Sequence, residues 1–170
     1  MFKREGVRAV PQRKGSEDTR REIFETALAL FREQGFERTT MRDVAARVGV
    51  ALGAAYYYFA SKDAIVGAYY DHVHEEHAAR CRDAFATAAD LRGRLRVALH
   101  SKVDVMAADR KLLRALFRYG GDPDHELSWF GPATAHRRRE SIALFAEALA
   151  GESLPADLRD AGPTLSLIHI

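Results

Sequence analysis

Apolar residues recur at intervals of three and four along most of the 170-residue chain, and strand-like alternation is absent. Such spacing puts apolar side chains on one face of a helix. The first such stretch, residues 17–34, ends at Gly35, a residue suited to a left-handed helix stop. We expect Ser16 or Thr19 to cap this helix, because Thr19 and Glu22 have the spacing of a capping box. The pattern predicts an all-α protein.

Two short helices follow closely. Thr40 and Asp43 repeat the capping spacing, and a short apolar stripe then ends at Gly49. A second short helix covers about residues 52–59, and Ser61 is placed to cap the next one. A medium helix followed by two short helices across a glycine-containing turn is the layout of a helix-turn-helix unit.

Charge is divided unevenly along the chain. Residues 1–62 hold 12 Lys and Arg against 8 Asp and Glu, a balance of +4, whereas the remainder holds 14 against 16, a balance of −2. A basic front part suggests a polyanionic partner. We therefore divide the chain into a flexible basic arm at 1–15, a helix-turn-helix domain at 16–62 and a helical domain at 63–170.

Composition excludes several classes of protein. A single cysteine cannot build an intrachain disulfide framework, and no apolar run approaches the roughly 18 residues of a membrane span. Lys3 and Arg4 are not followed by the apolar segment of a secretory signal. We expect a cytoplasmic protein without a membrane partner.

The second short helix has small residues at its start and three consecutive tyrosines after them. An α-helix can enter the major groove of DNA if its leading residues allow close approach. Helical neighbours are about 100° apart, so the tyrosines cannot all face one core. We expect at least two of them to face DNA, the alternative being rings buried in the core. With the starts of the flanking helices, the candidate DNA contacts are Thr40, Arg42, Leu52, Gly53, Ala54, Tyr56, Tyr57, Tyr58 and Lys62.

Residues 39–50 and 53–65 resemble the second helix, the recognition helix and the start of the fourth helix of the tetracycline-repressor-like (TetR) family. The resemblance implies a homodimeric repressor that binds a palindromic operator in double-stranded DNA and is released by a small-molecule ligand. Three features depart from the family pattern: Ala51 replaces a usual Ser or Thr, Leu52 and Ala54 replace polar base readers, and Tyr58 replaces a frequent His.

The helical domain would hold the ligand pocket in such a family. Apolar and aromatic residues on its predicted helices indicate a hydrophobic or aromatic small molecule, although such residues are also typical of plain core. His136 is a further polar candidate, and Arg137–Arg139 are expected to be solvated or paired with acidic neighbours. The candidate lining is Leu99, Val103, Met106, Phe117, Tyr119, His125, Trp129 and Phe130.

The sequence gives little support for metal binding or for catalysis. His74, His77 and Cys81 have the spacing of metal ligands, but their charged neighbours predict an exposed helix face, so we expect neither a metal site nor a cofactor. A nucleophile elbow and a glycine-rich phosphate loop are both missing from the sequence, which argues against an enzyme. The rival hypothesis is a helical small-molecule-binding or adaptor domain that does not bind DNA.

The last residues form an abrupt ending. Members of the family use two further helices as a dimer interface, and we expect this chain to lack most of that element. We expect either that the sequence is truncated here or that its last few residues are not native. The apolar side chains exposed in that case would be Leu158, Leu165, Leu167 and Ile168.

Overall fold

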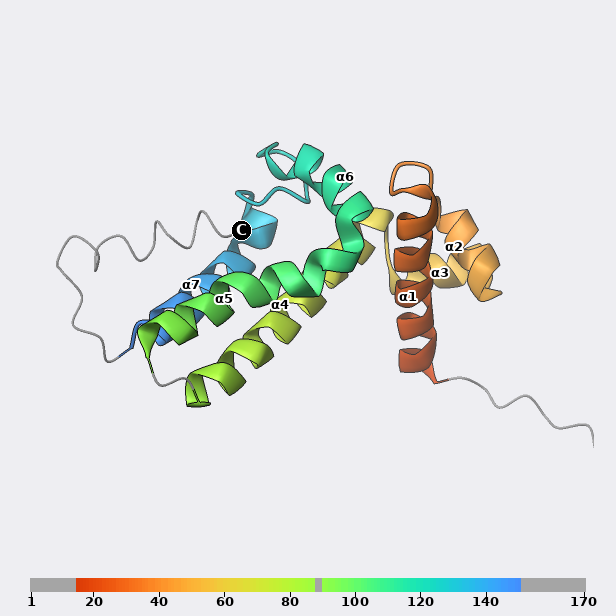
Figure 1. The fold of residues 1–170 in the computed structure, drawn as a ribbon. Coiled ribbons are helices and arrows are strands. Elements are labelled where there is room, and N and C mark those ends of the chain that lie inside the picture. Colours follow the sequence, from red (N-terminus) through yellow and green to blue (C-terminus); the bar gives the residue numbers. More distant parts are fainter. Residues whose placement is uncertain (1–14, 88–89, 151–170) are drawn as a thin grey trace, which may run out of the picture.

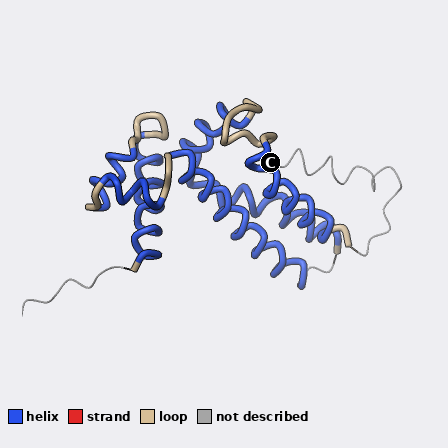
Figure 2. The backbone as a smooth tube through the Cα atoms, turned by 180° about the vertical axis from the view of Figure 1, so that it is seen from behind, coloured by secondary structure: helices blue, strands red, loops and turns tan. Residues whose placement is uncertain are grey.

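The computed structural model describes residues 15–87 and 90–150, and within these ranges every regular element is a helix (Figures 1 and 2). The all-α prediction is confirmed. The predicted basic arm and the predicted exposed apolar residues near the end lie outside the described residues. The helices are α1 (Ser16–Gln34), α2 (Met41–Val48), α3 (Leu52–Tyr58), α4 (Lys62–Thr87), α5 (Leu91–Met106), α6 (Arg110–Gly120) and α7 (Ala135–Ala148), with single 3-10 turns η1 (Ala107–Asp109) and η2 (Pro132–Thr134).

Helices α1, α2 and α3 form the helix-turn-helix end of the molecule (Figure 1). The predicted capping box of α2 is confirmed, because the Thr40 hydroxyl accepts a hydrogen bond from the Asp43 N–H while the Asp43 carboxylate accepts one from the Thr40 N–H. Gly49 ends α2 at φ 81° and Gly35 ends α1 at φ 92°, conformations that favour glycine.

The predicted cap of α1 is wrong. Gly15 is the N-cap and makes no side-chain capping bond, so neither Ser16 nor Thr19 occupies that position. Thr19 lies inside the helix, where its hydroxyl donates to the Gly15 carbonyl at 3.3 Å. The helix begins one turn earlier than a cap at Thr19 requires, which rules out a capping box with Glu22.

Helix α4 leaves the helix-turn-helix end and runs into a second group of helices, where it packs beside α5 and α7 (Figures 1 and 2). Helix α6 lies back against α1. One apolar core runs through both ends of the molecule, because buried residues of α4 and α6 such as Ile65, Tyr69 and Leu116 pack in the same cluster as Phe31 of α1. A smaller cluster around Cys81 and Phe145 joins α4, α5 and α7.

A buried acid ties the two ends together. Asp109, only 3% exposed, sits in η1 between α5 and α6. Its carboxylate accepts a hydrogen bond from Arg32 Nε of α1 at 2.5 Å and one from the Tyr69 hydroxyl of α4 at 2.9 Å. Burial of the Tyr69 ring, together with this carboxylate, raises the pKa of its hydroxyl, so the phenol stays protonated as the donor. The α1 helix is thereby connected to the end of α5.

None of the helices in the described ranges has the length and apolar character needed to cross a membrane.

Candidate DNA-binding face and ligand cavity

Helix α3 turns one side to the core and leaves the other outside. Ala55 is fully buried, the Phe59 that follows the helix is 4% exposed, and Leu52 and Tyr58 are half-buried against the same core. The opposite side is covered by no described residue: Tyr57 is 81% exposed and Tyr56 is 48% exposed. Two of the three tyrosines therefore face solvent, while Tyr58 packs edge-on against Tyr57 and inward on the core.

The start of α3 is unobstructed. Gly53 is exposed, its φ is not positive, and a Cβ added there would meet nothing within 4 Å. Neither backbone geometry nor internal packing therefore requires glycine at this position. Ala54 beside it is half-buried and small. The side chains on the outer side of the first turn of α3 are small, so another macromolecule can approach the backbone closely there.

Helix α2 begins next to this surface. Arg42 is exposed at its first turn, and Thr40 is exposed as its N-cap. The Thr40 hydroxyl donates to Asp43 Oδ2 at 2.7 Å, and this bond with that of the Thr40 N–H lowers the pKa of the Asp43 carboxyl. Thr40 is thus held in place by the cap, and the guanidinium of Arg42 extends beside it into solvent.

Lys62 lies at the start of α4 and already has an internal partner. Its Nζ donates to the Phe36 carbonyl at 2.9 Å and sits over the Phe36 ring at 4.4 Å from the centroid. The ammonium therefore holds the turn after α1 against the start of α4. To meet a phosphate it would have to share or exchange this bond.

A family model described as bacterial regulatory proteins, tetR family, matches residues 23–69, the stretch that contains most of α1, all of α2 and α3, and the start of α4. Residues 23–69 therefore carry the sequence pattern of the TetR family. This matched segment includes the exposed side of α3.

Two named relatives are similar to part of the chain. The HTH-type transcriptional regulator TtgR of Pseudomonas putida is 34% identical over 102 residues, which are 60% of this chain and 42% of TtgR. The HTH-type transcriptional repressor KstR2 of Mycobacterium tuberculosis is 43% identical over 53 residues, 31% of this chain and 26% of that protein. The matches thus span less than half the length of these curated relatives.

A solved structure extends the likeness to most of the chain. The transcriptional regulator of the TetR/AcrR family from Thermobifida fusca matches with a TM-score of 0.59 and 27% identity, covering 88% of this chain and 80% of that one. The helices after α4 therefore follow the arrangement of a TetR/AcrR protein as well.

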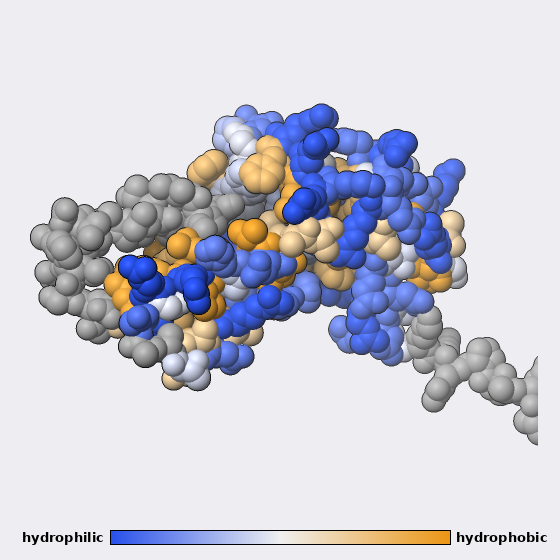
Figure 3. Space-filling view, in the orientation of Figure 1, coloured by the Kyte–Doolittle hydropathy of each residue, from blue (hydrophilic) through white to orange (hydrophobic). Residues whose placement is uncertain are grey.

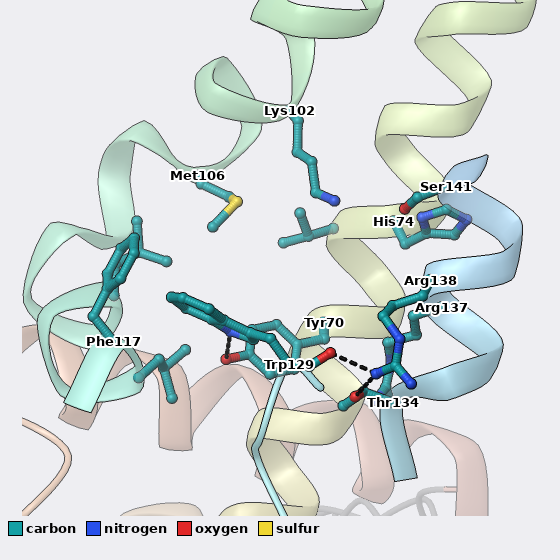
Figure 4. A pocket seen from close by; sticks show the side chains of 13 residues that line it. Tyr70, His74, Lys102, Met106, Phe117, Trp129, Thr134, Arg137, Arg138 and Ser141 are labelled. Carbon is teal, nitrogen blue, oxygen red and sulfur yellow. Dashed lines mark hydrogen bonds between the residues drawn. The ribbon is translucent and has the colours of Figure 1, made fainter. Parts of the chain in front are cut away.

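A cavity of about 80 Å³ lies between α4, α5, α6 and α7 (Figure 4). Three of the predicted lining residues, Met106, Phe117 and Trp129, do line it. Sequence reasoning missed Tyr70, His74 and Lys102 among others. The complete lining is Tyr70, Val73, His74, Lys102, Met106, Leu113, Leu116, Phe117, Trp129, Thr134, Arg137, Arg138 and Ser141.

The other predicted pocket residues lie elsewhere. Leu99, Val103 and Phe130 are exposed by 41%, 64% and 56%. The Tyr119 ring stacks on His125 at 4.5 Å between centroids, and its hydroxyl donates to Glu37 of the turn after α1. His136 is exposed, with Nε2 3.7 Å from the Asp71 carboxylate.

The arginines of α7 were expected to be solvated or paired with acidic neighbours; Arg139 is exposed, Arg137 is paired with Asp71, and Arg138 is bonded to the preceding loop instead. Arg137 Nε donates to Asp71 at 2.5 Å and its Nη2 donates to the Gly67 carbonyl at 3.0 Å. Arg138 Nη1 donates to the carbonyls of Trp129 and Gly131 and to the Thr134 hydroxyl (Figure 4). These donors fasten α7 to α4 and to the loop before it.

The expected exposed face around His77 is also corrected. His77 is 1% exposed and Cys81 is fully buried, because both lie on the side of α4 that packs against α5. His77 Nδ1 is 2.8 Å from the Ser101 hydroxyl of α5. Within the described part of the chain, no group of three or more His, Cys, Asp or Glu residues is arranged to hold a metal ion.

Proposed function

We propose that this protein is a sequence-specific DNA-binding transcriptional regulator of the TetR family, and that it acts as a repressor. The observation that carries the proposal is the outer side of α3, where Tyr57 is 81% exposed next to an unobstructed Gly53. Aromatic rings exposed to solvent contribute little to the stability of the fold. On a helix whose first residues are small, they are available to contact an external partner. The name of KstR2 as a repressor supports the direction of regulation.

The proposed DNA contacts divide by role. Gly53, Ala54 and Tyr56 would lie against base edges in the major groove, because they form the outer side at the start of the recognition helix. Thr40, Arg42 and Tyr57 would contact phosphates and fix the position of that helix. Such a protein would work in the cytoplasm beside the chromosome. As a homodimer, it would place two copies of α3 in successive major grooves of a palindrome.

The cavity supplies the second half of the proposal, release of DNA by a small molecule. Met106 lines the cavity, and three residues later Asp109 binds Arg32 of α1 and Tyr69 of α4. A ligand that displaces Met106 would shift η1 and, with it, the angle of α1 relative to α4. Release then requires only that the ligand bind the shifted arrangement more tightly than the DNA-binding one.

The test is a band-shift titration on the DNA upstream of the protein's own gene, with footprinting to locate the site. We expect Tyr57→Ala to weaken binding by about tenfold, the effect of losing one good phosphate contact and its packing. The matched control is Phe130→Ala, since Phe130 is an exposed aromatic residue at the other end of the molecule. Protection of a palindromic site by the wild type, with reduced affinity in Tyr57→Ala alone, supports the proposal.

Two outcomes would overturn it. If the wild type binds the upstream DNA no better than an unrelated duplex, the rival hypothesis of a helical ligand-binding or adaptor domain gains. If Tyr57→Ala and Phe130→Ala both bind with wild-type affinity, Tyr57 does not contact DNA, and the observation that carries the proposal fails.

A further inference from the structure

The cavity contains one charged group that the protein leaves without a partner. Lys102 extends from α5 into the cavity, with its ammonium directed toward the middle of the lining (Figure 4). Arg137 and Arg138, the other two cations of the lining, are bonded to Asp71 and to loop carbonyls. Lys102 has no such bond to any residue of the described ranges.

The surroundings of Lys102 make this arrangement costly. Met106, Phe117 and Trp129 present apolar surface to the cavity, and burial alone lowers the pKa of the Lys102 ammonium. An ammonium withdrawn from water without a counter-charge is destabilising, and an anion placed beside it removes that cost. The fold thus carries an unfavourable charge that a ligand would relieve.

The rest of the lining has the same sign. Among the described residues that line the cavity, three are Lys or Arg and none is Asp or Glu. Arg137 is paired with Asp71, whereas Lys102 and Arg138 have no acidic partner among the described residues, so the lining favours anionic over neutral or cationic guests. The volume of about 80 Å³ is well below that of a site for a drug-sized ligand, so the guest is small.

We infer that the effector of this protein is a small carboxylic acid, whose carboxylate binds Lys102 and whose hydrocarbon part packs against Met106, Phe117 and Trp129. This inference rests on the proposed function of the cavity as the effector site. It narrows the earlier expectation of a hydrophobic or aromatic molecule to one with a negative head group.

Trp129 provides the measurement, because it is the only tryptophan of the chain and lines the cavity. Hexanoate and its neutral counterpart hexanamide differ in head-group charge while sharing one hydrocarbon chain. We expect hexanoate to change the tryptophan fluorescence saturably and to bind at least about tenfold more tightly than hexanamide, the size expected for a hydrogen bond to a charged group.

The decisive variant is Lys102→Met, which keeps the length of the side chain and removes the charge. It should abolish the preference for hexanoate over hexanamide and raise the melting temperature of the ligand-free protein, because a half-buried charge without a bonded partner is gone. The matched control is Lys111→Met in α6, a lysine outside the cavity lining, which should keep the preference. The rise in melting temperature shows that a loss of binding is not a loss of folding.

Three results would overturn the inference: equal affinity for hexanoate and hexanamide in the wild type, an unchanged preference in Lys102→Met, or no saturable response to hexanoate at millimolar concentration. The fluorescence titration uses no DNA, so its failure is separate from failure of the band shift. If the protein binds DNA as proposed but does not bind hexanoate, the proposed function as a DNA-binding regulator is retained and only the class of effector is wrong.

Discussion

Two groups of residues that look alike in the sequence differ in how the fold uses them. One group consists of polar residues at the helix-turn-helix end, namely the three tyrosines of α3 and Arg42 of α2. The other group consists of the arginines of α7. In α7 the donors of Arg137 and Arg138 are bonded to Asp71 and to loop carbonyls. At the helix-turn-helix end Tyr57 and Arg42 extend into solvent. In Figure 3 the surface around α1 is largely hydrophilic, while apolar surface gathers on the side of α4, α5 and α7.

The difference separates side chains that hold the fold from those available for a partner. A group whose hydrogen-bonding capacity is used inside the molecule affects stability when it is removed. A group left outside affects only binding. Stability and DNA affinity should therefore respond to different substitutions, and the first two variants below are each expected to change one of these quantities and leave the other unchanged.

The largest effect is expected for Arg138→Met. The change leaves the Gly131 carbonyl and the Thr134 hydroxyl, both in buried residues, without this donor. We expect the free energy of unfolding to fall by about 2 kcal/mol in chemical denaturation, with DNA affinity of the folded protein unchanged. Arg139→Met, an exposed neighbour, serves as control and should change stability by less than about 0.5 kcal/mol. Equal losses in both variants would contradict the assignment.

The converse is expected for Arg42→Met. Stability should stay within about 0.5 kcal/mol of the wild type, because Arg42 is exposed. DNA affinity should fall about tenfold at low salt, and the slope of log affinity against log salt should decrease in magnitude by about 1, as for the loss of one phosphate contact. Arg92→Met, an exposed arginine of α5, should leave that slope unchanged. A slope unchanged in Arg42→Met would remove this residue from the interface.

Local signals in the sequence were sufficient for the helix-turn-helix end. Capping by Thr40 and Asp43, the glycine stop at Gly49 and the exposure of Tyr57 all follow from residues within a few positions of one another. The failure at the start of α1 has a local cause too, since the Thr19 hydroxyl bonds to the Gly15 carbonyl one turn back. Lys62 shows the limit: its bond to Phe36 spans 26 residues and has no local signature.

The cavity was harder to predict because its walls come from four helices. Of the lining residues predicted on α5, Leu99 and Val103 are exposed and only Met106 lines the cavity. The sequence did contain a signal for Lys102 as a cavity residue. Leu95, Lys102 and Met106 share a helical face, so Lys102 is a lysine in an apolar row, a pattern typical of a functional buried charge. The burial of Asp109 depends on packing between α1 and η1 and has no comparable signal.

A smaller effect is expected for Gly53→Ala, where the two quantities should move in opposite directions. Alanine in the first turn of α3 should raise the free energy of unfolding by about 0.5 kcal/mol, because a Cβ meets no atom there and helix propensity improves. DNA affinity should fall, because the methyl group lies where DNA would approach. Gly67→Ala in α4 is the control, with a similar gain in stability and no change in DNA binding. Unaltered DNA affinity in Gly53→Ala would show that DNA does not approach this closely.

The smallest effect concerns the cap of α2 at low pH. The hydroxyl and N–H of Thr40 lower the pKa of Asp43 below its ordinary 3.8 in the folded state, so the ionised carboxylate is favoured by folding. This contribution to stability is complete at a pH above the ordinary pKa and is lost as the pH falls through the pKa of the folded state.

Asp43→Asn retains an acceptor oxygen but cannot titrate. The wild type should therefore melt higher than the variant at pH 7, and the difference should shrink as the pH falls below about 4. Because Asp43 lies at the surface, the shift should be small, and salt should reduce it little, since hydrogen bonds to Thr40 cause it. A difference in melting temperature that stays constant from pH 7 to pH 3 would mean that the capping bond does not depend on the charge of Asp43.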